Sequence, residues 1–228
     1  MNSEKILNIL EKIEVKENSK KEFEDLKREL QADILTGGKI NKGLLATFKK
    51  YVKENEKAHR EKFMKIYKTK NGHYCFTNGY FLIDFGTDIN NINKNIRSYV
   101  DENIMADSSL NFENLSDKFA TKIKELNIID LEKNMKYNEI RQKELKEKNI
   151  LPLPFQIDET FVNASFFINV LKIIDKKVDK ITVNYNTAIS PIQFKIDDIS
   201  ILILPIKLNS ENLETVKKEK ENFDKLMK

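Results

Sequence analysis

Two segments of the chain share one plan, a helix followed by short strands, and this repeat constrains the fold more than any other feature. Residues 39–86 and 161–208 each place an asparagine, Asn41 and Asn163, where a helix N-cap belongs. Apolar residues follow at matching offsets, with the spacing of one helix face. They are Leu44, Leu45, Phe48 and Val52 in the first segment, and Phe166, Phe167, Val170 and Ile174 in the second. We therefore predict an α+β fold with a duplicated helix-plus-β-hairpin unit.

Turn residues divide the remainder of each segment into strands. The Asn-Gly pairs at 71–72 and 78–79 are strong turn signals between apolar runs of the first segment. In the second segment we expect four short strands after the helix, with turns at 186–187 and 197–198. Each half-unit is therefore expected to contribute antiparallel strands to the sheet.

Further segments surround and divide the repeat. The predicted organisation is an N-terminal helical extension over 1–36, a domain over 37–208 with half-units 39–86 and 156–208 and a helical insertion at 87–150, and a C-terminal helix over 209–228. In the insertion, one helix face is predicted from the spacing of Leu115, Phe119, Ile123 and Leu126. Asp130 and Ser210 are the predicted caps of the two helices that follow.

The composition is that of a folded protein in a reducing compartment. Of the 228 residues, 40% are hydrophobic, which is enough for a substantial core. The single cysteine, Cys75, excludes an internal disulfide framework. The first residues lack the apolar stretch of a secretory signal, and no apolar run reaches the ~20 residues that span a bilayer. We expect a cytoplasmic protein with no membrane partner.

The charge is unevenly distributed along the chain. The formal net charge is +4, and both half-units hold more basic than acidic residues. A basic core with acidic flanks points to a polyanionic partner. The alternative is that the lysines only solvate the surface helices, as charge runs usually do.

Four stretches resemble the bacterial DNA polymerase III sliding clamp, or β subunit, family. Residues 163–167, 188–192 and 202–208 are similar to the final half-domain of a clamp, and residues 77–82, Thr-Asn-Gly-Tyr-Phe-Leu, resemble its Thr-Asp-Gly-x-Arg-Leu loop. The resemblance implies a DNA-clamp-like fold, in which the two helix-plus-β-hairpin half-units form a sheet backed by two helices. It also implies a bacterial, phage or mobile-element origin. Clamps of this family carry three such domains in each chain, whereas this chain has material for one.

The resemblance also implies two kinds of binding residue. In clamps, helices contact DNA phosphates without reading sequence, and the matching lysines here are Lys42, Lys49 and Lys53 on one helix and Lys172 and Lys176 on the other. Clamps also bind apolar partner peptides in a cleft. The matching positions are Thr77, Gly79, Tyr80, Leu82, Leu204, Pro205, Ile206 and Lys207. In the family these two elements come from adjacent domains, so two chains or a rearrangement would be needed. The alternative is that the apolar residues are ordinary core residues of strands.

The sequence carries no strong signal of an enzyme. The two histidines, His59 and His73, stand in no zinc-binding or catalytic-triad pattern, and no phosphate-binding loop is found. We therefore expect no catalytic residue, metal or cofactor. The predicted function is sequence-independent DNA association, binding of replication or repair proteins, or both. The predicted partners are double-stranded DNA, such proteins and further copies of the chain. The alternative is an interaction or regulatory module with a clamp fold that does not bind DNA.

Overall fold

The chain folds into two compact units of mixed α+β structure. The computed structural model describes residues 3–11, 19–39, 41–60, 63–104, 121–148 and 150–227. Unit 1 is built from residues within 1–78, 85–110 and 172–175, and unit 2 from residues within 79–84, 111–171 and 176–228. Within the described ranges, no helix combines the length and the apolar character needed to cross a membrane. The predicted α+β class is confirmed.

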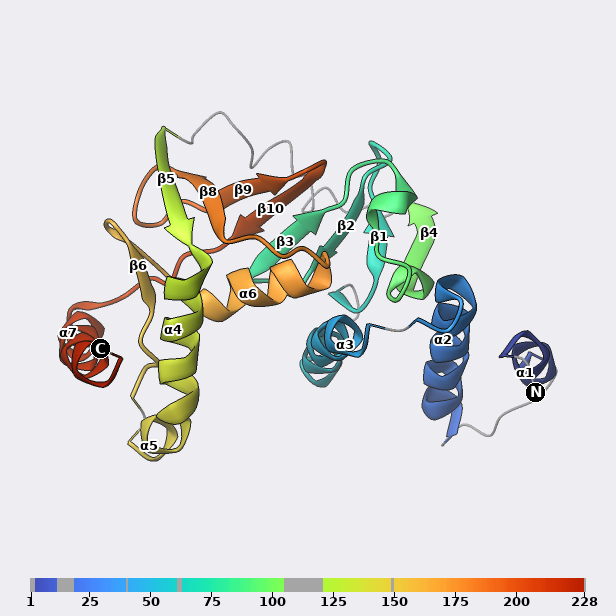
Figure 1. Cartoon of the computed structure of the whole chain (residues 1–228), viewed down its shortest axis with the longest axis horizontal. Coiled ribbons are helices and arrows are strands. Elements are labelled where there is room, and N and C mark those ends of the chain that lie inside the picture. Colours follow the sequence, from blue (N-terminus) through green and yellow to red (C-terminus); the bar gives the residue numbers. More distant parts are fainter. Residues whose placement is uncertain are drawn as a thin grey trace. The chain divides into compact units, whose positions relative to one another are not determined.

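Unit 1 contains three helices, three strands and two short 3-10 turns in its described part (Figure 1). They are α1 (Ser3–Leu10), α2 (Lys20–Thr36), α3 (Lys42–Lys57), β1 (Ile66–Lys68), β2 (Tyr74–Thr77), η3 (Ile89–Asn91), η4 (Arg97–Tyr99) and β4 (Val100–Ile104). β1 pairs antiparallel with β2 and parallel with β4. The β1–β2 connection contains Gly72 at φ 83°, so the hairpin predicted from its Asn-Gly pair is confirmed.

The first predicted helix is present and packs on the strands of its own unit. The side-chain oxygen of Asn41 accepts a hydrogen bond from the Leu44 amide at 3.1 Å, so the predicted N-cap is confirmed. Phe48 is fully buried, and its ring centroid lies 4.5 Å from Phe76 and 5.0 Å from Tyr99. The core of unit 1 is therefore an aromatic contact between α3, β2 and η4.

Helix α2 also belongs to this core. The guanidinium of Arg28 lies over the Tyr99 ring, 5.1 Å from its centroid, and the Ser98 hydroxyl donates to the Arg28 carbonyl at 3.4 Å. The helix ends at Gly37, whose φ of 62° is the left-handed conformation that glycine adopts without a steric penalty. Helix α2 of the N-terminal extension therefore packs on unit 1.

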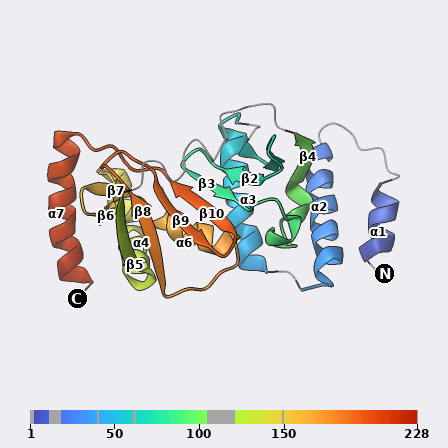
Figure 2. The ribbon, with the colours of Figure 1, turned by 90° about the horizontal axis from the view of Figure 1, so that it is seen from above.

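Unit 2 combines a five-stranded antiparallel arrangement with four helices and a small hairpin. Its elements are β3 (Phe81–Asp84), β5 (Lys122–Asn127), α4 (Ile128–Ile140), α5 (Gln142–Glu147), β6 (Phe155–Ile157), β7 (Thr160–Val162), α6 (Ala164–Ile173), β8 (Lys180–Tyr185), β9 (Ile192–Ile196), β10 (Ile199–Ile203) and α7 (Ser210–Leu226). The strand order is β3-β10-β9-β8-β5, and β6 pairs with β7 alone. Figure 2 shows β8, β9 and β10 side by side.

The second predicted helix is α6, which packs on β3 and β9. The side-chain oxygen of Asn163 accepts from the Ser165 amide at 3.0 Å and so caps the helix start. Phe167 is fully buried and stacks on Phe194 with 5.6 Å between ring centroids. Three strands follow α6, not the expected four, because the chain beyond Ile203 forms no strand and Pro205 has no N–H to donate to a sheet.

The predicted helix across residues 123–126 is wrong. These residues belong to β5, which pairs with β8 at Leu126↔Ile181. Leu126 is buried but Ile123 is 74% exposed, so their three-residue spacing does not mark a common buried face. The other two residues of that predicted face, at 115 and 119, lie outside the described residues.

Two predicted helix caps are displaced. α4 begins at Ile128 with Asn127 at the N-cap position, so Asp130 lies in its first turn, where a negative charge favours the helix dipole. α7 is capped by Asn209, whose side-chain oxygen accepts from the Asn212 amide at 2.8 Å, and not by Ser210. Both N-cap positions hold asparagine, but the Asn127 side chain makes no cap hydrogen bond, whereas that of Asn209 does.

Helix α7 is joined to α4 through a partly charged core. The rings of Phe223 and Tyr137 meet edge to face, with centroids 5.4 Å apart. The Tyr137 hydroxyl donates to Glu219 Oε2 at 2.7 Å, and Arg141 Nη2 lies 3.3 Å from Glu219 Oε1. Glu219 is only 4% exposed. The C-terminal helix is therefore an integral part of unit 2.

Candidate functional site

An apolar surface lies where β3 begins and β10 ends. The amide of Leu204 donates to the carbonyl of Tyr80 at 2.8 Å, which sets the two residues side by side. The Tyr80 ring stacks on Phe166 of α6, with 5.7 Å between centroids and 14° between ring planes. Tyr80 is 52% exposed and Leu204 is 42% exposed. We call Tyr80, Phe166, Leu204, Pro205 and Ile206 the Tyr80 surface.

The register of β3 against β10 explains why these residues meet. Leu82 pairs with Leu202, so the alignment brings the turn before β3 to the segment after β10. Gly79 in that turn has a φ of 89°, a conformation that side chains rarely adopt. Beyond β10, the Ile206 amide donates to the Phe161 carbonyl at 2.7 Å. One chain therefore brings together two elements that were expected to need two chains or a rearrangement.

The predicted cleft residues differ in exposure. Leu82 is 6% exposed, which agrees with the alternative of an ordinary core residue. Thr77 is buried as well and belongs to unit 1, whereas the residues of the Tyr80 surface belong to unit 2. Lys207 is exposed beside Ile206. The accessible part of the predicted set is thus Gly79 and Tyr80 with residues 204–207.

The five predicted phosphate-binding lysines are not equivalent. Lys42, Lys53 and Lys172 are exposed, and none of them forms an ion pair with a described residue. Lys49 pairs with Glu29 of α2, and Lys176 Nζ lies 2.5 Å from Asp197. These two charges are partly neutralised.

Two lysines have surroundings that the sequence did not indicate. Lys176 was predicted on the second helix, but α6 ends at Ile173, and Asp175 adopts a left-handed φ of 56° directly before Lys176. Lys176 is therefore in a loop. Lys53 lines a cavity of about 210 Å³ in unit 1 together with acidic residues. Those acids are Glu24, Asp25 and Glu56.

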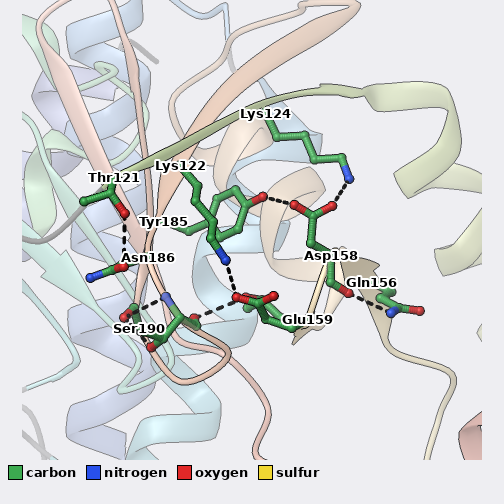
Figure 3. Close-up of polar contacts among 11 residues, drawn as sticks. Thr121, Lys122, Lys124, Gln156, Asp158, Glu159, Tyr185, Asn186 and Ser190 are labelled. Carbon is green, nitrogen blue, oxygen red and sulfur yellow. Dashed lines mark hydrogen bonds and ion pairs between the residues drawn. The ribbon is translucent and has the colours of Figure 1, made fainter.

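A polar cluster fixes the turn between β6 and β7 to β5 and β8 (Figure 3). Lys124 Nζ donates to Asp158 Oδ1 at 2.5 Å, and the Tyr185 hydroxyl donates to Asp158 Oδ2. Glu159 pairs with Lys122. The hydrogen bond from Lys124 is the main reason that the pKa of Asp158 is lowered, and the bond to Asp158 raises the pKa of Tyr185 to about 12. These groups hold the turn in place. No motif marked them, because their partners are distant in sequence.

The lowered pKa of Asp158 predicts a contribution to stability that is present at neutral pH and lost at acid pH. Asp158→Asn should lower the melting temperature at pH 7, since it removes the charge that Lys124 pairs with. A carboxyl group whose pKa is lowered by folding stabilises the fold at pH values above its pKa in the unfolded chain, about 4. This stabilisation is lost as the pH falls through the pKa of the folded protein. The melting temperatures of wild type and variant should therefore converge near about pH 2. Asparagine also tolerates the φ of 50° at this position.

Circular dichroism melting at both pH values tests this expectation. Asp198→Asn, in the exposed turn between β9 and β10, is the matched control and should leave the melting temperature nearly unchanged at pH 7. A constant difference between wild type and Asp158→Asn across the pH range would contradict the assigned role of Asp158.

The described residues contain no group of three or more histidine, cysteine, aspartate or glutamate side chains placed to hold a metal ion. Cys75 is buried in β2 and, as the single cysteine of the sequence, forms no disulfide within the chain. His59 lies just after α3 with a φ of 51°, and His73 ends the β1–β2 connection.

Two solved structures of bacterial DNA polymerase clamps are similar to part of this chain. The DNA polymerase III β subunit of Thermotoga maritima aligns over 60% of this chain and 55% of its own, with 11% identity and a TM-score of 0.39. The Helicobacter pylori β clamp bound to a DNA ligase peptide aligns over 60% of this chain and 41% of its own, with 12% identity and a TM-score of 0.31. The chain thus matches 55% of the length of the first of these proteins and 41% of the second. No protein-family model matches it, and no curated protein is similar to it in sequence.

Proposed function

We propose that this chain is a non-enzymatic, clamp-like protein that binds short apolar peptide segments of replication or repair proteins at the Tyr80 surface. The observation that carries the proposal is the exposure of Tyr80 and Leu204 next to each other, with Phe166 stacked behind the tyrosine. An exposed aromatic ring held by a second ring is already ordered, so a partner loses little side-chain entropy on binding it.

The chemistry of the Tyr80 surface favours a peptide with bulky apolar side chains. Covering apolar area contributes roughly 25 cal/mol per Å², and aromatic residues are enriched among the residues that dominate interface energies. Lys207 is exposed at the end of the surface and provides a cation for an acidic flanking residue. The proposed partner segment is therefore apolar with an acidic neighbour.

A synthetic DNA ligase peptide, of the kind bound by the Helicobacter pylori clamp, is the direct probe. Its fluorescence anisotropy should rise on titration with the wild-type chain. Tyr80→Ala and Leu204→Ala should each weaken binding about 10-fold or more, as truncation of an interface hot spot does. Ile189→Ala is the matched control, because Ile189 is a 71% exposed apolar residue outside the Tyr80 surface. No binding, or equal weakening by all three variants, would count against the proposal.

Sequence-independent DNA association is a second proposed function, supported by the exposed cations of unit 1. Lys42, Lys53 and Lys172 are the lysines among the five candidates that pair with no described acidic residue. Such contacts make the affinity for DNA fall as salt rises. The logarithm of the affinity falls linearly with the logarithm of the salt concentration, with a slope of about 0.9 for each phosphate contact. The triple variant with glutamine at these positions should lose about 2 to 3 units of that slope.

Duplex DNA titrations from about 50 to 200 mM salt measure this slope. A triple glutamine variant of exposed lysines on α7 is the control, and it should keep the wild-type slope. The control positions are Lys217, Lys218 and Lys225. Peptide binding without salt-dependent DNA binding would select the alternative, an interaction module that does not bind DNA. A solution mass of one 26.8 kDa chain would exclude a ring of several copies around the duplex.

A further inference from the structure

A cavity of about 470 Å³ opens within unit 2, and its lining shares no residue with the Tyr80 surface. This volume lies in the range of about 300–1,000 Å³ that is typical of small-molecule sites. Helices α4 and α7 and the β6–β7 hairpin supply the walls. The lining residues that matter for its chemistry are Leu153, Phe161, Val216, Phe223, Met227, Asp130, Lys133, Asn134 and Lys220.

The deeper wall of the cavity is apolar. Val216 and Phe223 of α7, with Met227 directly after this helix, pack with Leu153 and Phe161 in the cluster that includes Tyr137. Phe223 is held edge to face by Tyr137. Phe223 and Met227 remain half-buried, so apolar surface is still accessible in the cavity. The wall favours an aliphatic or aromatic group over a polar one.

The polar side chains that line the cavity are two lysines, two amides and one carboxylate, of which the Gln156 amide already donates to the Asp158 carbonyl at 2.7 Å. Lys133 of α4 and Lys220 of α7 are exposed, and neither pairs with an acidic side chain in the part of the chain that the structure describes. Asn134 is only 5% exposed, and its side-chain oxygen accepts from Asn138 Nδ2 at 3.4 Å. The Asn134 amide group donates no hydrogen bond to a described residue. Asp130 is the opposing charge, so these residues leave a net positive charge.

We propose that this cavity binds a medium-chain alkyl carboxylate. The alkyl chain would cover the half-buried side chains of Phe223 and Met227, and the carboxylate would accept hydrogen bonds from the two ammonium groups and the buried amide. A carboxylate bonds to several donors at once, whereas a neutral alcohol cannot pair with either charge. The chain length follows from the volume, because the cavity exceeds what acetate fills.

Calorimetric titration of the full chain with decanoate tests the proposal. Each methylene contributes roughly 0.8 kcal/mol, so affinity should rise about three- to fourfold per methylene from hexanoate to decanoate. Acetate should not bind measurably. Decanol should bind more weakly than decanoate, since it has the same chain and no charge. Equal affinity for decanol and decanoate would overturn the assigned role of the lysines.

Removing the two lysine charges distinguishes binding in the cavity from adventitious binding of an amphiphile elsewhere on the protein. The double variant Lys133→Gln, Lys220→Gln should weaken decanoate binding about 10-fold and leave decanol binding unchanged. The matched control is Lys136→Gln with Lys217→Gln, which removes one exposed lysine from each of the same helices outside the cavity lining. Equal weakening by both pairs would overturn the proposal.

Two other occupants are distinguished by the same measurements. Absence of decanoate binding in a chain that sediments as a dimer would assign the cavity to contact between two copies and overturn the proposal. Displacement of decanoate by the DNA ligase peptide would assign it to a peptide, with the same consequence. Leu204→Ala should leave decanoate binding intact. A failure of the proposed cavity ligand can therefore be distinguished from a failure of the proposed peptide binding at the Tyr80 surface.

Discussion

Replacing Phe167 with alanine is expected to lower the free energy of unfolding by about 3–5 kcal/mol, the usual cost of removing a buried phenylalanine. The side chain is fully buried, and its ring stacks on Phe194 of β9. Removal leaves a cavity between α6 and the sheet of unit 2, where the helix backbone prevents full collapse. Urea unfolding followed by circular dichroism measures the loss.

The adjacent residue provides the control for this prediction. Phe166→Ala should cost only about 1 kcal/mol, because that side chain is half-buried at the surface. It should, however, weaken binding of the ligase peptide, since Phe166 supports the Tyr80 ring. Equal loss of stability from the two variants would contradict the packing assigned to α6.

Replacing Glu219 with alanine is expected to destabilise unit 2 by about 3 kcal/mol, near the lower end for removing one partner of a buried ion pair. Glu219 is 4% exposed and accepts hydrogen bonds from Tyr137 and Arg141. Its loss leaves the tyrosine hydroxyl without this acceptor and Arg141 without its buried partner. Glu144, 3.2 Å from Arg141, still pairs with the guanidinium and keeps the cost moderate.

Two further variants isolate the contribution of this contact. Tyr137→Phe removes only the hydroxyl and should cost about 1 kcal/mol, the usual net worth of a hydrogen bond. The double variant with Glu219→Ala should cost less than the sum of the single losses, since both remove the same bond. Glu221→Ala, an exposed position on the same helix, should stay within about 0.5 kcal/mol of wild type. Additive losses would contradict a direct coupling of Tyr137 to Glu219.

The repeated helices could be predicted because their signals are local. Asn41 and Asn163 cap helices with their own side chains, and the apolar spacing after them identifies the faces that Phe48 and Phe167 bury. Asn71-Gly72 likewise specifies its hairpin through neighbouring residues alone. Each of these features depends only on residues that are close together in the sequence.

The features that were missed depend on distant partners. Residues 122–127 form a strand because β8 pairs with them, and this outweighs a spacing that also fits a helix. Asp158 and Tyr185 meet through the fold, and neither stands in a motif. The end of α6 depends on a left-handed Asp175, a conformation that aspartate adopts less readily than glycine. Predicting these contacts requires the tertiary arrangement itself.

The pairing of β3 with β10 has a consequence for the order of folding. β3 is a short, wholly buried strand from the first half of the chain, and its partner in unit 2 lies near the C-terminal end. During synthesis the strand emerges long before that partner, so Phe81 and Ile83 stay without their final cover until Ile203 has been made. Non-local pairing of this kind slows folding and leaves unpaired edges open to association. The nascent chain should therefore need protection by a chaperone over most of its synthesis.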